Sequence, residues 1–172
     1  MKHLLLTLSV CAGIMTANAQ GVYQIPNSDF EGNWNTNTRG KYTETTPENW
    51  NSFYTAQGSA TTLAFMVANQ IGTLSKSTDS HSGNGAALIT ATKNLLGSIS
   101  NGNLTTGIVN MGSATANDPE NYNFSDMSSN TGCCQFAGLP DAVRFWVKFN
   151  SQDASKGNAS ANMILHTDAG YM

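Results

Sequence analysis

Two carboxylates stand two positions apart in the stretch PNSDFEGNW, residues 26–34. Side chains at positions i and i+2 of an extended segment share a face, so Asp29 and Glu31 can point the same way while Phe30 enters a core. Calcium prefers oxygen ligands, and paired carboxylates beside an Asn-rich turn can supply them. We therefore predict a structural calcium ion at Glu31 and Asp29, with Glu31 as the stronger ligand. The alternative is a solvated turn in which Asp29 bonds the backbone.

Three tryptophans, Trp34, Trp50 and Trp146, could contact a sugar, because a flat indole covers the apolar face of a pyranose ring. Trp50 lies in a stretch rich in aromatic and amide groups, PENWNSFY. Trp146 shares one side of a predicted strand with Arg144 and Lys148, which can donate hydrogen bonds to hydroxyls or acidic sugars. The pattern predicts ligand binding by Trp50, Trp146 and Arg144. A structural role, in which the indole plugs the end of a core, competes at both tryptophans.

Catalytic chemistry has little support in the sequence. Glycoside hydrolysis needs two carboxylates across the scissile bond, and the acids of this chain lie in turns with no distinctive setting. His81 lies in the turn DSHSGNG without a nucleophile motif beside it, which favours a histidine that only satisfies its turn. We predict no catalytic residue. A hydrolase that uses Glu31 or Glu48 stays open as an alternative.

The first 19 residues have the pattern of an export signal. Lys2 and His3 precede an apolar run, and Ala17-Asn18-Ala19 supplies the small residues that signal peptidase needs. The run is too short for a membrane-spanning helix. We expect residues 1–19 to be removed and residues 20–172 to form one exported domain. Its location would be periplasmic, on the outer-membrane surface or extracellular.

Composition and turn chemistry predict an all-β domain. Charged residues make up 11% of the chain and its net charge is −3, which argues against nucleic acid as a partner. Abundant Asn, Ser, Thr and Gly separate short β-type segments, a pattern typical of a jelly-roll β-sandwich. Asn101-Gly102 is a strong hairpin signal, and residues 117–129 are expected to form a loop. The predicted strands cover residues 22–25, 61–68, 85–92, 104–109, 142–149 and 162–167. Strands that would close the sandwich are expected to be missing at the C-terminus.

The clearest strand pattern is GLPDAVRFWVKF, residues 138–149. Its side chains alternate between apolar and polar with a period of two, which is typical of a strand with one face in a core and the other in water. The predicted core face comprises Val143, Phe145, Val147 and Phe149.

Cys133 and Cys134 are adjacent. Neighbouring Cα atoms lie about 3.8 Å apart, closer than an ordinary disulfide allows, so a bridge between them would be strained. Without a nearby histidine the pair does not predict a zinc site. A loop that carries two thiols is the simpler interpretation.

Four stretches together resemble the carbohydrate metabolism domain family of secreted and surface proteins in the Bacteroidetes. They are IPNSDFEGNW with PENWNSF, DSHSGNGAALIT, NGNLTTGIVNMGS and GLPDAVRFWVKF, and they span most of residues 24–150. The resemblance implies a galactose-binding-like jelly roll exported by glycan-using anaerobes, and it supplies no catalytic residues. We expect a non-catalytic module that binds glycan or associates with other surface glycan-utilisation proteins. A glycoside hydrolase and a structural or adhesive surface domain are the alternatives.

Overall fold

The computed structural model describes residues 24–39, 42–61, 72–93, 97, 99–115, 117–129, 131–136, 140, 142–151, 155, 159–167 and 170–171. The predicted export signal, and the predicted strand 61–68 apart from its first residue, lie outside this set. The described elements are ten β-strands and one short 3₁₀ helix, and all five strand pairs are antiparallel. This confirms the all-β class. Each sheet has two strands, so the described residues do not form the large sheets of a jelly roll.

The longest strand pair was not predicted from the sequence. β1 (Trp34–Arg39) pairs with β2 (Tyr42–Pro47), with Trp34 opposite Pro47 and Arg39 opposite Tyr42. Threonines on both strands favour extended backbone, because branching at Cβ packs well on a pleated surface. Because these residues are polar, the two strands show no alternation of apolar and polar side chains, which is the usual signal of a strand. The inward positions of β2 are polar: Glu44 is 3% and Thr46 1% exposed.

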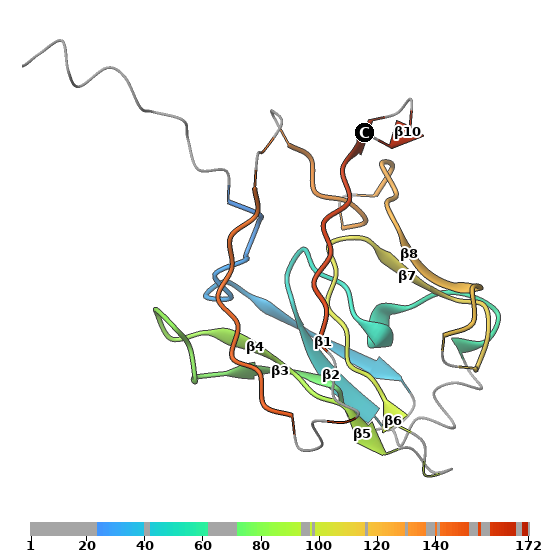
Figure 1. Cartoon of the computed structure of the whole chain (residues 1–172), viewed down its shortest axis with the longest axis horizontal. Helices are drawn as coiled ribbons and strands as arrows, with labels where there is room; N and C mark the ends of the chain where they lie inside the picture. The colour runs from blue at the N-terminus through green and yellow to red at the C-terminus, as the bar shows by residue number, and fades with distance from the viewer. Residues whose placement is uncertain are drawn as a thin grey trace, which may run out of the picture.

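Four further pairs complete the described architecture (Figure 1). They are β3 (Leu74–Ser77) with β4 (Ala86–Ile89), β5 (Thr92–Lys93) with β6 (Ile99–Ser100), β7 (Ile108–Met111) with β8 (Asn121–Phe124), and β9 (His166–Thr167) with β10 (Gly170–Tyr171). β4 confirms the centre of the predicted strand 85–92, and β9 confirms only the end of 162–167.

Several predicted boundaries are wrong. β8 lies within the expected loop 117–129, where the Asn and Asp residues suggested turns. Asn101-Gly102 does not join paired strands, since β6 and β7 belong to different sheets. Gln24 and Ile25 are not in a strand, and the chain turns directly after them: the Ser28 N–H donates to the Ile25 carbonyl at 3.1 Å.

A small apolar core joins the segment after β2 to β7. η1 (Phe53–Thr55) follows β2, and Ser52 caps it by accepting a hydrogen bond from the Tyr54 N–H at 3.1 Å. Beyond this turn Ala56 packs with Val109 and Met111, at 3%, 6% and 3% exposure. This cluster, with Phe53 packed against it, connects the end of η1 to β7.

Glu44 ties three segments together. The Ser52 hydroxyl donates to Oε1 at 2.5 Å, and the backbone N–H groups of Thr73 and Leu74 donate to Oε2 at 2.7 and 3.0 Å. Burial raises the pKa of Glu44, against the opposing effect of these hydrogen bonds. One carboxylate thus fastens β2 to the cap of η1 and to the start of β3.

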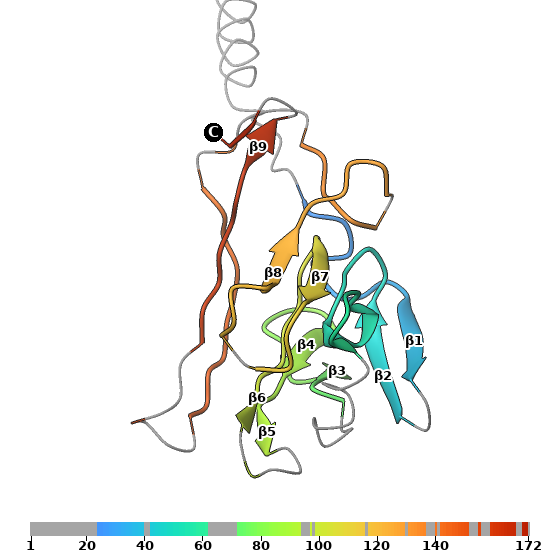
Figure 2. The same cartoon turned by 90° about the vertical axis from the view of Figure 1, so that its right-hand side faces the viewer.

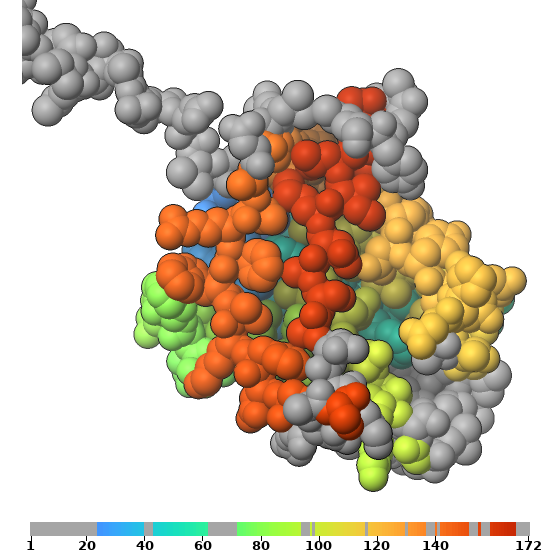
Figure 3. All heavy atoms as spheres, viewed as in Figure 1, coloured from blue at the N-terminus to red at the C-terminus, as the bar shows by residue number. Residues whose placement is uncertain are grey.

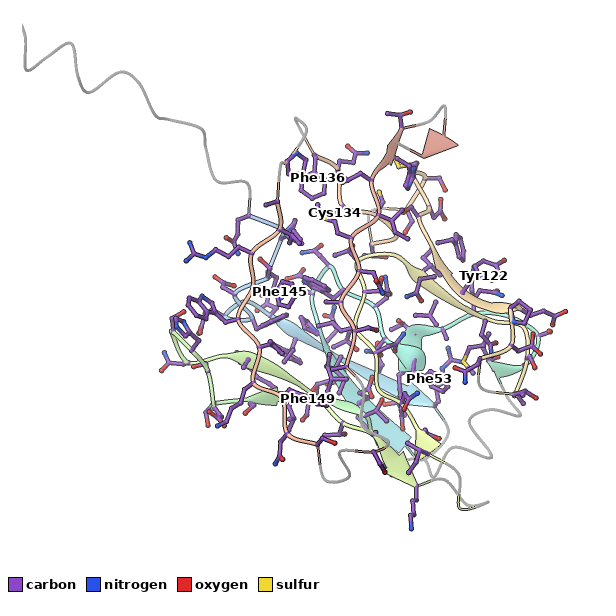
Figure 4. All side chains as sticks on the ribbon, in the orientation of Figure 1. Phe53, Tyr122, Cys134, Phe136, Phe145 and Phe149 are labelled. Atoms are coloured by element: carbon purple, nitrogen blue, oxygen red, sulfur yellow. The ribbon has the colours of Figure 1, made fainter. Side chains whose placement is uncertain are left out.

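Two extended segments, 142–151 and 159–167, run side by side over one face of the paired strands (Figures 1 and 2). In the space-filling view they cross that face from end to end (Figure 3). Figure 4 shows Phe145 and Phe149 on the side of the first segment that faces the second.

The prediction that residues 142–149 bury one face is wrong. Every described residue from 142 to 150 is exposed, and the chain there has no ladder partner among the described residues. The predicted core residues Val143, Phe145, Val147 and Phe149 are 46%, 56%, 73% and 55% exposed. The physical reason is that alternation creates an apolar face but not its cover, and burial needs a second layer packed on that face.

Glu44→Gln should alter how stability depends on pH. Because the folded state raises the pKa of Glu44, this group contributes stability that is complete below its unfolded pKa and is lost as pH rises through the folded value. The free energy of unfolding of wild type minus that of the variant should therefore be larger near pH 5 than near pH 8. Urea unfolding across that range measures it, with the exposed Glu120→Gln as the control for loss of one carboxylate. Parallel pH profiles for wild type and Glu44→Gln would contradict the prediction.

Candidate functional site

Two segments far apart in the sequence meet at Trp146. The turn between β3 and β4 supplies His81, whose ring lies flat on the indole with centroids 3.8 Å apart and an interplanar angle of 6°. The same turn supplies Asp79, whose Oδ2 lies 2.6 Å from Lys148 Nζ. These two contacts hold the segment 142–151 against the turn. The two residues of the ion pair are 69 positions apart in the sequence.

The side chains at this junction form a surface that we call the Trp146 patch, defined by Asp79, His81, Arg144, Trp146 and Lys148. Trp146 is 65% exposed, and Arg144 Cζ lies 5.8 Å from the indole centroid, within the range of a cation–π interaction. The Lys148 and Asp79 side chains are 79% and 68% exposed, so solvent screens their attraction. The ion pair therefore contributes to orientation more than to stability.

The Trp146 patch combines three kinds of contact that a polar ring-shaped ligand can use. The indole offers flat apolar surface, Arg144 offers hydrogen-bond donors, and Asp79 offers acceptor oxygens. The imidazole already covers part of the indole, so a ligand would meet the indole surface that His81 leaves exposed.

The sequence pattern predicted three of the five residues of this patch. The period of two placed Arg144, Trp146 and Lys148 together, and the structure keeps Arg144 at the indole. His81 was expected only to satisfy its own turn, and its stacking on Trp146 was missed. Asp79 was missed as well. A contact between a turn and a distant segment leaves no local signal in the sequence.

Trp50 and Trp34 lie in a different cluster, around Phe30. The ring centroid of Phe30 is 5.9 Å from that of Trp50 and 6.3 Å from that of Trp34, both in tilted geometry. The Trp50 indole N–H donates to the Pro26 carbonyl at 3.0 Å, and that of Trp34 donates to the Phe30 carbonyl at 3.1 Å. These contacts favour the structural role for Trp50, and its role in ligand binding stays a prediction.

Glu31 organises the turn that carries the patch. Its Oε1 accepts hydrogen bonds from the backbone N–H groups of Asn84 and Gly85 at 2.5 and 2.7 Å. Gly83, beside them, has a φ of +70°, and a Cβ built at this position would collide with the same carboxylate oxygen. The carboxylate thus fixes the end of the turn that presents His81 and Asp79.

Both predicted calcium ligands, Asp29 and Glu31, accept hydrogen bonds from backbone N–H groups. Asp29 Oδ1 accepts a hydrogen bond from the Glu31 N–H at 3.2 Å, as in the solvated-turn alternative. Among the described residues no three His, Cys, Asp or Glu side chains gather into a group that could hold a metal ion. Hydrogen bonding alone accounts for both carboxylates, and calcium at Glu31 and Asp29 stays a prediction.

No protein-family model, curated protein sequence or solved structure matches this chain. The resemblance to the carbohydrate metabolism domain family therefore stays a prediction. Within the described part of the chain, no helix has the length and apolar character needed to cross a membrane.

Glu31→Ala should destabilise the protein whether or not calcium is present. Two backbone N–H groups, that of Asn84 at an exposed position and that of Gly85 in a partly buried one, lose their acceptor. This loss costs about 1 kcal/mol and lowers the melting temperature by a few degrees. Thermal melts of wild type and variant, in calcium and in chelator, measure this, with the exposed Glu120→Ala as the control. A calcium-dependent stabilisation of wild type that Glu31→Ala abolishes would instead establish the calcium site. A melting temperature that is the same for wild type and Glu31→Ala in every condition would contradict both the hydrogen-bonding role and the calcium-binding role of Glu31.

Proposed function

We propose that this protein is an exported, non-catalytic glycan-binding module and that the Trp146 patch is its sugar-contacting surface. The observation that carries the proposal is an indole 65% exposed to solvent, oriented by a stacked imidazole and flanked by a guanidinium group. A large aromatic side chain in this setting is typical of a binding surface, because exposing it to water without a partner is unfavourable.

The chemistry of the patch suits a carbohydrate. The apolar face of a pyranose can pack on the indole, while its hydroxyls exchange hydrogen bonds with Arg144 as donor and Asp79 as acceptor. His81 and the ion pair between Asp79 and Lys148 hold these groups in place before the ligand arrives. Such preorganisation reduces the entropy lost on binding.

A jelly-roll-like sandwich belongs to the same proposal. The segments 142–151 and 159–167 would be strands of a second layer, laid over the sheets formed by the first part of the chain (Figures 1 and 2). The leader-like residues 1–19 support export to the periplasm, the outer-membrane surface or the extracellular space. Calcium at Asp29 and Glu31 would be structural, and other surface glycan-utilisation proteins would be further partners.

A glycan array probed with the full-length protein tests the proposal, followed by titration calorimetry on the glycan that binds best. Trp146→Ala should weaken binding about tenfold, equivalent to about 1.4 kcal/mol, because the stacking surface is lost. The matched control is Tyr122→Ala, which removes an aromatic side chain of 52% exposure on β8 and should leave affinity unchanged.

The two ways in which this proposal can fail are distinct. A blank array with folded protein, shown by a cooperative melt, would overturn glycan binding and favour the adhesive or structural alternative. If Tyr122→Ala weakens binding as much as Trp146→Ala does, the protein still binds glycan, but the binding site lies outside the Trp146 patch.

A further inference from the structure

A pocket of about 320 Å³ lies at a second place on the molecule, between the loop after β8 and the turns at Pro26 and Asn49. Three of its lining side chains carry sulfur: Met127, Cys133 and Cys134. None of the described residues that line it is charged. Figure 4 labels Cys134 on this loop, at the end of the molecule opposite β5 and β6.

Hydrogen bonds fix the loop that carries these sulfurs. Asp126 Oδ1 accepts from the Ser128 N–H at 2.9 Å and from its hydroxyl at 2.6 Å, and the Asp126 N–H donates to the Gly132 carbonyl at 2.9 Å. The Asn51 side-chain amide donates to the Thr131 carbonyl at 2.5 Å, which attaches the loop to the segment after β2. Met127 and Cys133 therefore sit at the two ends of a preorganised turn.

The two cysteines are present as thiols and are half-buried, while Met127 is 50% exposed. Cys133 makes a weak hydrogen bond to the Ser129 carbonyl at 3.9 Å. Among the described residues that line the pocket there is no lysine, arginine or histidine, the cationic side chains that activate a catalytic cysteine. The cluster is better suited to coordination than to nucleophilic catalysis.

Sulfur ligands select soft cations, and a set of two thiols with a thioether selects Cu(I). Zinc prefers four ligands drawn from Cys, His and carboxylates, and the described residues offer no group of three such side chains. The described residues that line the pocket include no carboxylate, the side chain on which calcium and magnesium sites mainly depend.

We propose that Cys133, Cys134 and Met127 form a Cu(I)-binding site. On binding, each cysteine loses its thiol proton to solvent and its sulfur forms a bond to copper, while the Met127 thioether donates a lone pair without losing a proton. Copper stays in the +1 state, so no electron is transferred. The site is separate from the Trp146 patch and does not depend on glycan binding.

The test is an anaerobic titration of the reduced, full-length protein with Cu(I) against a chromogenic Cu(I) chelator. All variants carry Cys11→Ser, so that Cys133 and Cys134 are the only thiols. We expect one equivalent of Cu(I) per chain, loss of that equivalent in Cys133→Ser and in Cys134→Ser, and weaker binding in Met127→Leu. Met163→Leu, at a methionine of 37% exposure outside the pocket, is the matched control and should bind as wild type does.

Alkylation gives an independent readout that does not rely on the variants. Iodoacetamide should modify both thiols in the copper-free protein and neither in the copper-loaded protein, as mass spectrometry would show. Failure to compete with the chelator, unchanged binding in the two serine variants, or equally tight binding of Zn(II) would each overturn the proposal.

Discussion

A single buried carboxylate constrains how the first half of this domain is assembled. Glu44 of β2 is 3% exposed, and it accepts hydrogen bonds from two other segments, from Ser52 at the η1 cap and from Thr73 and Leu74 at the start of β3. A carboxylate buried among donors on separate segments can satisfy its oxygens only if all of them are in place. The β1–β2 pair, the η1 cap and the start of β3 are thus locked to one another by a polar group rather than by a large apolar core.

The candidate binding surface depends on a second carboxylate used in a similar way. Glu31 accepts two backbone N–H groups at the end of the β3–β4 turn, and this turn presents His81 and Asp79 to the segment 142–151. Residues 142–150 have no ladder partner in the described part of the chain, and the contacts that hold them at the patch are side-chain contacts with the turn. His81 and Asp79 therefore both hold this segment in place and form part of the candidate binding surface.

Local patterns predicted the class of the fold but not its assembly. Turn residues and short alternating segments indicated an all-β chain, and β4 was found where small residues follow a Gly-rich turn. The β1–β2 pair is not predicted from the sequence because its threonines give no apolar period, although they favour extended backbone. At Val143 and Phe145 the difference is the opposite one, since alternation predicts burial and both side chains are exposed.

The sequence alone determined the β character of the chain, the positions of several turns and the proximity of Arg144, Trp146 and Lys148, because these follow from a period of two within one segment. Only the tertiary structure decided that His81 stacks on Trp146, that Glu44 is buried, and that Met127 shares a pocket with Cys133 and Cys134. Contacts of that kind join distant segments, and packing of the whole chain selects them. No spacing along the sequence encodes them, because backbone geometry fixes directions over only a few residues.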